Sequence, residues 1–319
     1  MSNLDKKILF SMSVAPFWHC GRTIRGNSIH TGIALMLVIA MAIWHWGLPV
    51  LGVVALSALV SLLTEEFWNK VMERCSTWSD GTALVSGVML ACLLPATAPF
   101  WLVIIGAFCM ITFGKMAFGG YGANPVSTVC VGWAMIFISF PIYMDPNAML
   151  LQTDFIDPLV RLKYFGPDFM MNCVSFTGLL FGHQIGALGA SQNLAIIIGG
   201  IYLLARGVIR MEIVISFIAG ILLLGGILNI YNPEQYVNPF YHLLTGTTLF
   251  CAFFLATEFA CAPDRAIGMW LYGLVGGMLV VVIRTYGIYT DGAPFAVMLI
   301  NLLSPYFAMI QPKPFGVKQ

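Results

Sequence analysis

Two isolated cations stand out among the apolar stretches of this sequence. Lys115 belongs to the run from Gly114 to Pro125, which holds four glycines and an Asn-Pro pair between two apolar segments. Glycines at this density let the backbone adopt positive φ and approach a ligand closely. Arg284 lies within another apolar segment, and a lone charge near a bilayer centre costs about 2.5–3.5 kcal/mol on insertion scales. Both cations therefore predict a polar site, either holding a phosphate or pairing with a carboxylate.

Simpler interpretations of the same charges remain open. Lys115 and Arg284 could extend their side chains to the nearest interface. Glu65 and Glu66 end another apolar segment, and we expect them at a solvated or salt-bridged surface. Asn124, inside the glycine run, is expected to satisfy local backbone groups as well as any ligand.

The composition places these residues in a membrane protein. Of the 319 residues, 59% are hydrophobic and only 9% are charged, whereas soluble domains carry about 25% charged residues. We predict an all-α polytopic membrane protein with about ten transmembrane helices, of which the third and fifth are short or broken. The predicted spans are 30–46, 48–66, 82–95, 99–117, 128–144, 193–209, 212–230, 241–257, 267–284 and 292–310.

The two halves of the chain resemble each other. The segments 84–87 and 243–246 align, and the step from Lys115 to the proline of the glycine run equals the step from Arg284 to Pro294. Copies that lie five spans apart have opposite orientations. The pattern thus predicts two inverted five-helix repeats, with a functional region between them near the midplane.

The basic residues predict the orientation. With a cytoplasmic N-terminus, only Arg161, Lys163 and Arg284 of the fifteen lysines and arginines lie outside, as the positive-inside rule requires. We therefore place both termini in the cytoplasm and the protein in the inner membrane of a bacterium or archaeon. A helix at 159–165 is expected on the outer surface. The predicted parts are a cytoplasmic segment 1–29, a first transmembrane half 30–144, an outer connection 145–192, a second half 193–310 and a cytoplasmic tail 311–319.

The sequence predicts no metal site. None of the eight cysteines forms a C-x-x-C pair, and the five histidines lack ligand spacing. The formal net charge of +1 gives no indication of a nucleic-acid partner. Nicotinamide fingerprints and iron–sulfur spacing are absent from the sequence, so any electrons must come from partner proteins.

Several short motifs, weak alone, occur in a specific order along residues 20–310. They are Gly21-Arg22-Thr23, Asp80-Gly81-Thr82-Ala83, Leu93-Leu94-Pro95, Ala98-Pro99, the glycine run, Ala252 to Glu258, Ile283 to Gly287, Phe295-Ala296-Val297 and Asn301. In these motifs the chain resembles the D subunit of Rnf electron-transport complexes and the homologous B subunit of sodium-pumping NADH:quinone reductases.

The resemblance implies a function. Rnf complexes couple electron transfer between reduced ferredoxin and NAD to translocation of Na⁺ or H⁺, and this subunit typically carries FMN esterified through its phosphate to a threonine. The family has an acidic residue at the place of Glu258, which implies a role in the ion pathway. The implied partners are the lipid bilayer and the other membrane and redox subunits of an Rnf-type complex.

The sequence departs from the family around the flavin site. Asp157 stands where the esterified threonine belongs, and the preceding Ser-Gly-Ala is missing. The later glycine motif keeps Gly186, Gly189 and Ser191 but lacks its glutamate. A carboxylate cannot form this ester, and its charge repels a phosphate. We therefore expect FMN or another flavin to be bound non-covalently, if it is bound.

The sequence thus predicts a membrane subunit of an Rnf-like ion-translocating oxidoreductase that is not active alone. Two alternatives remain: a channel or carrier for a small solute, and a scaffold subunit without redox chemistry. No residue is predicted to be catalytic. The candidate cofactor-binding residues are Lys115, Gly119, Gly120, Asn124, Asp157, Gly186, Gly189, Ser191 and Arg284, and Glu258 is the candidate for the ion pathway.

Overall fold

The computed structural model describes residues 22–144, 157–166 and 175–310. These ranges contain helices, turns and loops but no strand, which confirms the predicted all-α fold. Predictions for residues 1–21, 145–156, 167–174 and 311–319 lie outside the described residues.

Five helices are long and apolar enough to cross a bilayer. With 1.5 Å of rise per residue, helices of 21–23 residues extend about 32–35 Å, close to the thickness of the hydrocarbon core. Local sequence sets the ends of the first, because Thr23 Oγ1 accepts from the Gly26 amide at its start and Gly47 adopts a φ of 79° at its end. The five are α1 (Ile24–Trp46), α2 (Pro49–Val71), α4 (Phe100–Gly114) extended by η2 (Met116–Phe118), α11 (Met211–Tyr231) and α14 (Ala266–Tyr286).

Four shorter apolar helices match further predicted spans. The fifth predicted span, 128–144, is interrupted where Pro141 follows Phe140, since proline removes a helix hydrogen bond and restricts the residue before it. The four are α3 (Thr82–Leu93), α5 (Thr128–Ser139), α10 (Asn193–Ala205) and α15 (Ala293–Ala308), and α6 (Pro141–Met144) follows the interruption.

The predicted span 241–257 is wrong as a single helix. α12 (Pro239–Leu244) stops, Gly246 adopts a φ of 63°, and α13 (Thr248–Phe250) leads into the π-helix η4 (Cys251–Leu255). The Thr248 hydroxyl donates to the Thr245 carbonyl oxygen at 3.0 Å, which satisfies a backbone group freed by the break. Broken helices persist in membranes where protein covers the irregular backbone.

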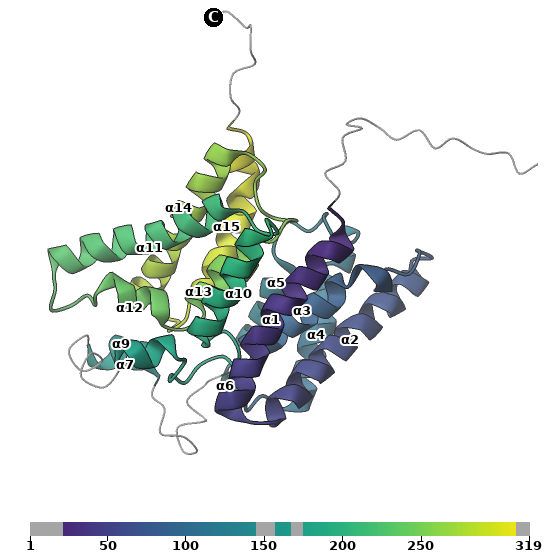
Figure 1. The fold of residues 1–319 in the computed structure, drawn as a ribbon, viewed down its shortest axis with the longest axis horizontal. Coiled ribbons are helices and arrows are strands. Elements are labelled where there is room, and N and C mark those ends of the chain that lie inside the picture. The colour runs from purple at the N-terminus through teal and green to yellow at the C-terminus, as the bar shows by residue number, and fades with distance from the viewer. Residues whose placement is uncertain (1–21, 145–156, 167–174, 311–319) are drawn as a thin grey trace, which may run out of the picture.

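The two halves repeat one packing order. α2 contacts α3 and α4, and α4 contacts α5; likewise α11 contacts α12 and α14, and α14 contacts α15. Equivalent helices also meet across the middle, α1 against α10 and α5 against α15, as a two-fold arrangement requires. This order agrees with the predicted internal repeat, as Figure 1 shows for the two groups of helices. The opposite membrane orientation of the repeats stays a prediction.

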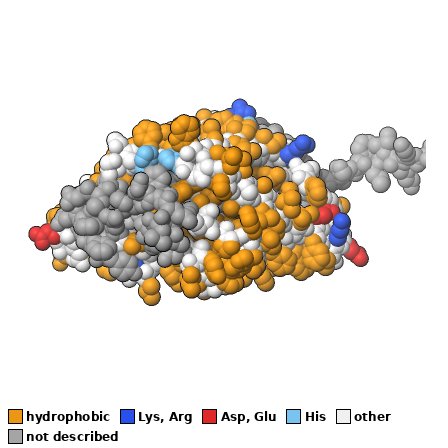
Figure 2. All heavy atoms as spheres, turned by 90° about the horizontal axis from the view of Figure 1, so that it is seen from below, with side chains coloured by type: hydrophobic (Ala, Val, Ile, Leu, Met, Phe, Trp, Pro, Cys, Tyr) orange, Lys and Arg blue, Asp and Glu red, His pale blue; other side chains and the backbone are white. Residues whose placement is uncertain are grey.

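The outer surface is largely apolar. Figure 2 shows hydrophobic side chains over most of the described surface on one face, with few charged groups between them. Met36, Leu59, Ile104 and Ile227 are among the exposed examples. Such a belt, on helices of this length, is typical of a protein surrounded by lipid.

Candidate functional site

Lys115 is held by a buried ion pair. It follows the last residue of α4 and is 3% exposed, and its Nζ lies 2.5 Å from Glu65 Oε1 on α2 and 2.8 Å from Thr82 Oγ1 at the start of α3. Glu65 also accepts from the Thr77 hydroxyl at 2.8 Å. The prediction that Glu65 lies at the surface is wrong, because α2 brings it under the α4–α5 connection, where the buried lysine requires a counter-charge.

The glycine run forms one wall of a cavity beside this ion pair. Gly119 and Gly120 have φ of 107° and 117°. A Cβ on Gly119 would meet nothing within 4 Å, and one on Gly120 would meet only Arg74 Nη1 at 3.9 Å. Arg74 also donates to the Gly119 carbonyl at 2.6 Å. The cavity, of about 270 Å³, is also lined by Lys115 and Tyr121. Two glycines with positive φ and a buried cation thus line the same cavity.

A second cavity of about 270 Å³ lies between the two halves. Its walls come from α1, α3, α10 and η4, with Phe253 and Phe254 among the apolar lining residues and Asn27 and Thr82 among the polar ones. Glu258, in the turn after η4, lines this cavity together with Tyr121. The sequence did not indicate this cavity, because its residues come from helices that are distant along the chain.

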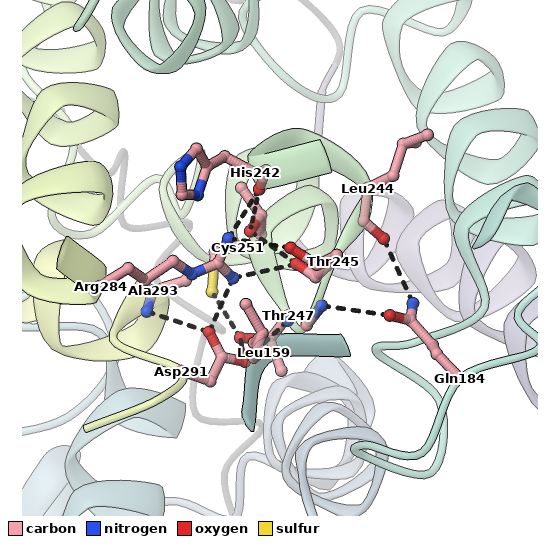
Figure 3. Close-up of polar contacts among 12 residues, drawn as sticks. Leu159, Gln184, His242, Leu244, Thr245, Thr247, Cys251, Arg284, Asp291 and Ala293 are labelled. Carbon is pink, nitrogen blue, oxygen red and sulfur yellow. Dashed lines mark hydrogen bonds and ion pairs between the residues drawn. The ribbon is translucent and has the colours of Figure 1, made fainter. Parts of the chain in front are cut away.

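Arg284 organises a different polar cluster. It lies in the last turn of α14, is 5% exposed, and is 2.9 Å from Asp291 Oδ1. Its guanidinium donates to the carbonyl oxygens of His242 at 2.6 Å and Thr245 at 2.9 Å, so it stabilises the break between α12 and α13. Figure 3 shows this guanidinium between those carbonyls and the Asp291 carboxylate. The second carboxylate oxygen of Asp291 accepts from the amide and hydroxyl of Thr247 at 2.8 and 2.7 Å.

Asp157 caps a short helix. Its Oδ1 accepts from the Leu159 and Val160 amides at 2.9 and 3.2 Å at the start of α7 (Pro158–Phe165), which confirms a helix at 159–165. Asp157 and Gly186 line a cavity of only about 70 Å³. On the same helix, Lys163 donates to the carbonyls of Gly287 and Ile288, and partial burial lowers the pKa of its ammonium group.

The other candidates make structural contacts. Asn124 donates to the Val126 carbonyl and to Cys261 Sγ, which ties the glycine run to the second half. Gly189 packs against Cys92 so closely that a Cβ would lie 2.7 Å from its sulfur. Ser191 donates to the Ala187 carbonyl at 2.8 Å.

The predicted residues therefore gather at two places. Lys115, Gly119 and Gly120 lie near the beginning of α1, whose Ile24 lines the same cavity. The cluster of Arg284 lies toward its other end, since His45 contacts His183 there and the adjacent Gln184 accepts from the Gly246 amide. Asp291 was missed, although an acid directly before the predicted span 292–310 was a usable signal.

Fold and sites together define a polytopic α-helical membrane protein with two similar halves, an ion pair with a buried cation in each, and a cavity between them. The chain belongs to the NQR2, RnfD, RnfE family, whose model matches residues 11–316.

Curated relatives cover nearly the whole chain. It is similar to the D subunit of the Na⁺-translocating ferredoxin:NAD⁺ oxidoreductase complex of Acetobacterium woodii, with 31% identity over 90% of this chain and 88% of that protein. The D subunit of the ion-translocating oxidoreductase complex of Escherichia coli is 28% identical over 97% of this chain and 99% of its own length. The protein of the same name from Alcanivorax borkumensis is 30% identical over 88% of this chain and 89% of its own length.

Proposed function

We propose that the chain is the D-type membrane subunit of an Rnf-like ion-translocating oxidoreductase. In this role it works with other membrane and redox subunits in ferredoxin- and NAD-linked electron transport, coupled to movement of Na⁺ or H⁺. The observation that carries the proposal is the match to relatives with these names along about nine-tenths of both chains. The chain works as part of that complex and not alone.

The residue at position 157 does not fit a covalently attached flavin. Asp157 uses its carboxylate to cap α7, and a carboxylate offers no hydroxyl for a phosphate ester. The adjoining cavity of about 70 Å³ is also far below the roughly 300 Å³ at which ligand pockets begin. The proposed subunit therefore has no FMN esterified at this position.

The cavity between the halves fits a flat aromatic cofactor better. Its volume of about 270 Å³ is near the lower bound for ligand sites, and it combines phenylalanine rings with hydroxyl and amide groups. Phe253 and Phe254 would contact a flavin held there, while Asn27, Ser28 and Thr82 would bind its polar groups. A flavin held there would supply one- and two-electron transfer.

Charged groups around this cavity are our candidates for the ion-coupling machinery. Glu258 faces the cavity from the turn after η4, and Lys115 with Glu65 borders the adjacent one. Carboxylate oxygens suit a hard cation or a proton. We assign Glu258 to the ion pathway and the Lys115–Glu65 pair to the support of the glycine run beside it.

Flavin binding is tested on the purified full-length chain. Fluorescence is measured in detergent before and after denaturation, with Ser28→Trp to fill the cavity and Ile29→Trp as its control. Ile29 is on the same helix but 52% exposed and lines no cavity described above. We expect flavin that leaves on denaturation, retained by Ile29→Trp and lost from Ser28→Trp.

Other outcomes have defined meanings. Fluorescence that migrates with the denatured band contradicts a non-covalent flavin. A chain without flavin that still co-purifies with redox subunits supports the scaffold alternative, and a colourless chain that transports a solute alone supports the channel or carrier alternative.

A further inference from the structure

A separate, larger cavity lies between α7, the connection from α11 to α12, and the end of α14. Its volume is about 450 Å³, within the range of small-molecule sites. Three basic side chains line it, those of Lys163, His242 and Arg284, together with the polar groups of Asn232 and Thr285. Neither the flavin proposal nor the ion-pathway proposal uses this cavity.

Two nitrogen atoms in its wall are buried and have no hydrogen-bond partner among the described residues. They are His242 Nδ1 and Arg284 Nε, on side chains that are 3% and 5% exposed. Buried polar atoms nearly always have a partner. Arg284 Nε is an obligate donor, and His242 Nδ1 donates in one neutral tautomer, so two residues that line the cavity each have a donor that lacks an acceptor.

Lys163 adds a positive charge that the protein does not neutralise locally. Its Nζ donates to two backbone carbonyls and forms no ion pair with any described carboxylate. An ammonium has three donors, so one is left for a ligand. Glu234 also lines the cavity but is exposed, where water and salt screen its charge.

We infer that this cavity binds a phosphate group through Lys163, Arg284 Nε and His242 Nδ1. The three donors come from three separate elements, α7, α14 and α12, and an oxyanion accepts hydrogen bonds from several directions. The group belongs either to a phospholipid head or to dissolved phosphate. The inference does not depend on a flavin.

The test uses the full-length chain in nanodiscs of phosphatidylcholine, with or without phosphatidylglycerol. Native mass spectrometry after release into detergent identifies any retained phospholipid, and a titration with inorganic phosphate, followed by thermal denaturation, measures binding of the free ion. The variants are Lys163→Gln, Lys163→Arg to retain the charge, and His242→Phe. Lys70→Gln is the control, because the Lys70 side chain is 77% exposed in another part of the molecule.

Either retained phosphatidylglycerol or saturable binding of inorganic phosphate supports the site. The first result identifies a phospholipid head as the source of the phosphate group, and the second identifies dissolved phosphate. Loss of one hydrogen bond to a charged group lowers affinity by about tenfold or more, so we expect this loss in Lys163→Gln and His242→Phe, and rescue in Lys163→Arg. Wild-type protein that retains neither ligand overturns the inference, as does equal binding by Lys163→Gln and Lys70→Gln. Flavin fluorescence, recorded on the same samples, is expected to be unchanged.

Discussion

At the scale of single residues, the clearest feature is a buried charge pair at the end of the glycine run. Lys115 and Glu65 are each 3% exposed. Removing one partner of such a pair leaves an uncompensated buried charge and costs about 3–5 kcal/mol, whereas replacing both by apolar residues is often nearly neutral. We therefore expect Lys115→Met and Glu65→Leu to lower the melting temperature in detergent strongly, and the double variant to recover most of the loss.

The second lysine–glutamate pair provides the control. Lys70 and Glu66 are neighbours of the same types on α2, with a separation of 3.8 Å and side chains 77% and 19% exposed. Exposed pairs contribute about 0–1 kcal/mol, so Lys70→Met should melt almost as the wild type does. Equal melting temperatures for Lys115→Met and Lys70→Met would show that the buried pair does not stabilise this end of the fold.

Residue chemistry could be predicted from the sequence only in part. The isolated positions of Lys115 and Arg284 in apolar segments indicated that each needs a partner. The partner of Lys115, Glu65, could not be derived, because it depends on how α2 packs under α4. The acid before the last span pointed to Asp291, but its pairing with Arg284 depends on how the chain turns after α14. Glu65 looked the same as Glu66 in the sequence, yet only Glu65 faces the protein interior.

At the scale of elements, hydropathy predicted where the helices lie but not which one is broken. The segment 241–257 is apolar enough for a span, and the signals of its interruption were only Thr245-Gly246-Thr247. A similar pair of a hydroxyl residue and a glycine occurs inside the intact helix α3 (Ser86-Gly87). The break depends on tertiary contacts instead, since Arg284 and Gln184 donate to the carbonyls of Thr245 and Leu244 before Gly246, and Asp291 accepts from the Thr247 amide after it.

Close helix packing leads to a second prediction. A Cβ on Gly277 of α14 would lie 2.1 Å from the Phe217 carbonyl oxygen of α11, and backbone cannot move aside cheaply. Gly226, within α11, has nothing within 4 Å of such a Cβ. Alanine favours a helix by about 0.5–1 kcal/mol over glycine. Gly226→Ala should therefore raise the melting temperature slightly. Gly277→Ala should lower it, because overpacking reduces the free energy of unfolding by about 1–3 kcal/mol.

The test compares the directions in which the two substitutions shift the melting temperature. Thermal denaturation of both variants in one detergent separates packing from helix propensity, because propensity favours both substitutions. A Gly277→Ala protein that is as stable as Gly226→Ala would mean that α11 and α14 are not in close contact in the folded protein. Small residues at helix contacts are the usual means of close approach in membranes.

At the scale of the whole molecule, the side of the membrane that each cavity faces depends on the orientation of the chain in the bilayer. The cavity beside Lys115 lies near the beginning of α1, and the cavity beside Lys163 lies toward the end of the molecule where α1 finishes. The 23 residues of α1 extend about 35 Å between those two ends. If the chain spans the bilayer as the basic residues predict, one cavity faces the cytoplasm and the other faces outward. A protein of this kind would contact soluble redox partners on one side and lipid heads or extracytoplasmic partners on the other.

Labelling of cysteines from each side of the membrane tests this orientation on the intact chain. Cys75 is exposed in the loop after α2, which the positive-inside rule places in the cytoplasm. Glu234, exposed in the connection after α11, is predicted on the opposite side. With Cys20 and Cys173 replaced by serine, a membrane-impermeant maleimide should therefore label Cys75 only in inverted vesicles. With Cys75→Ser added to that background, Glu234→Cys should be labelled only in intact spheroplasts, because five spans separate the two positions. Labelling of both from one side would contradict the odd number of crossings between them, and with it the inverted repeats that place the two cavities on opposite faces.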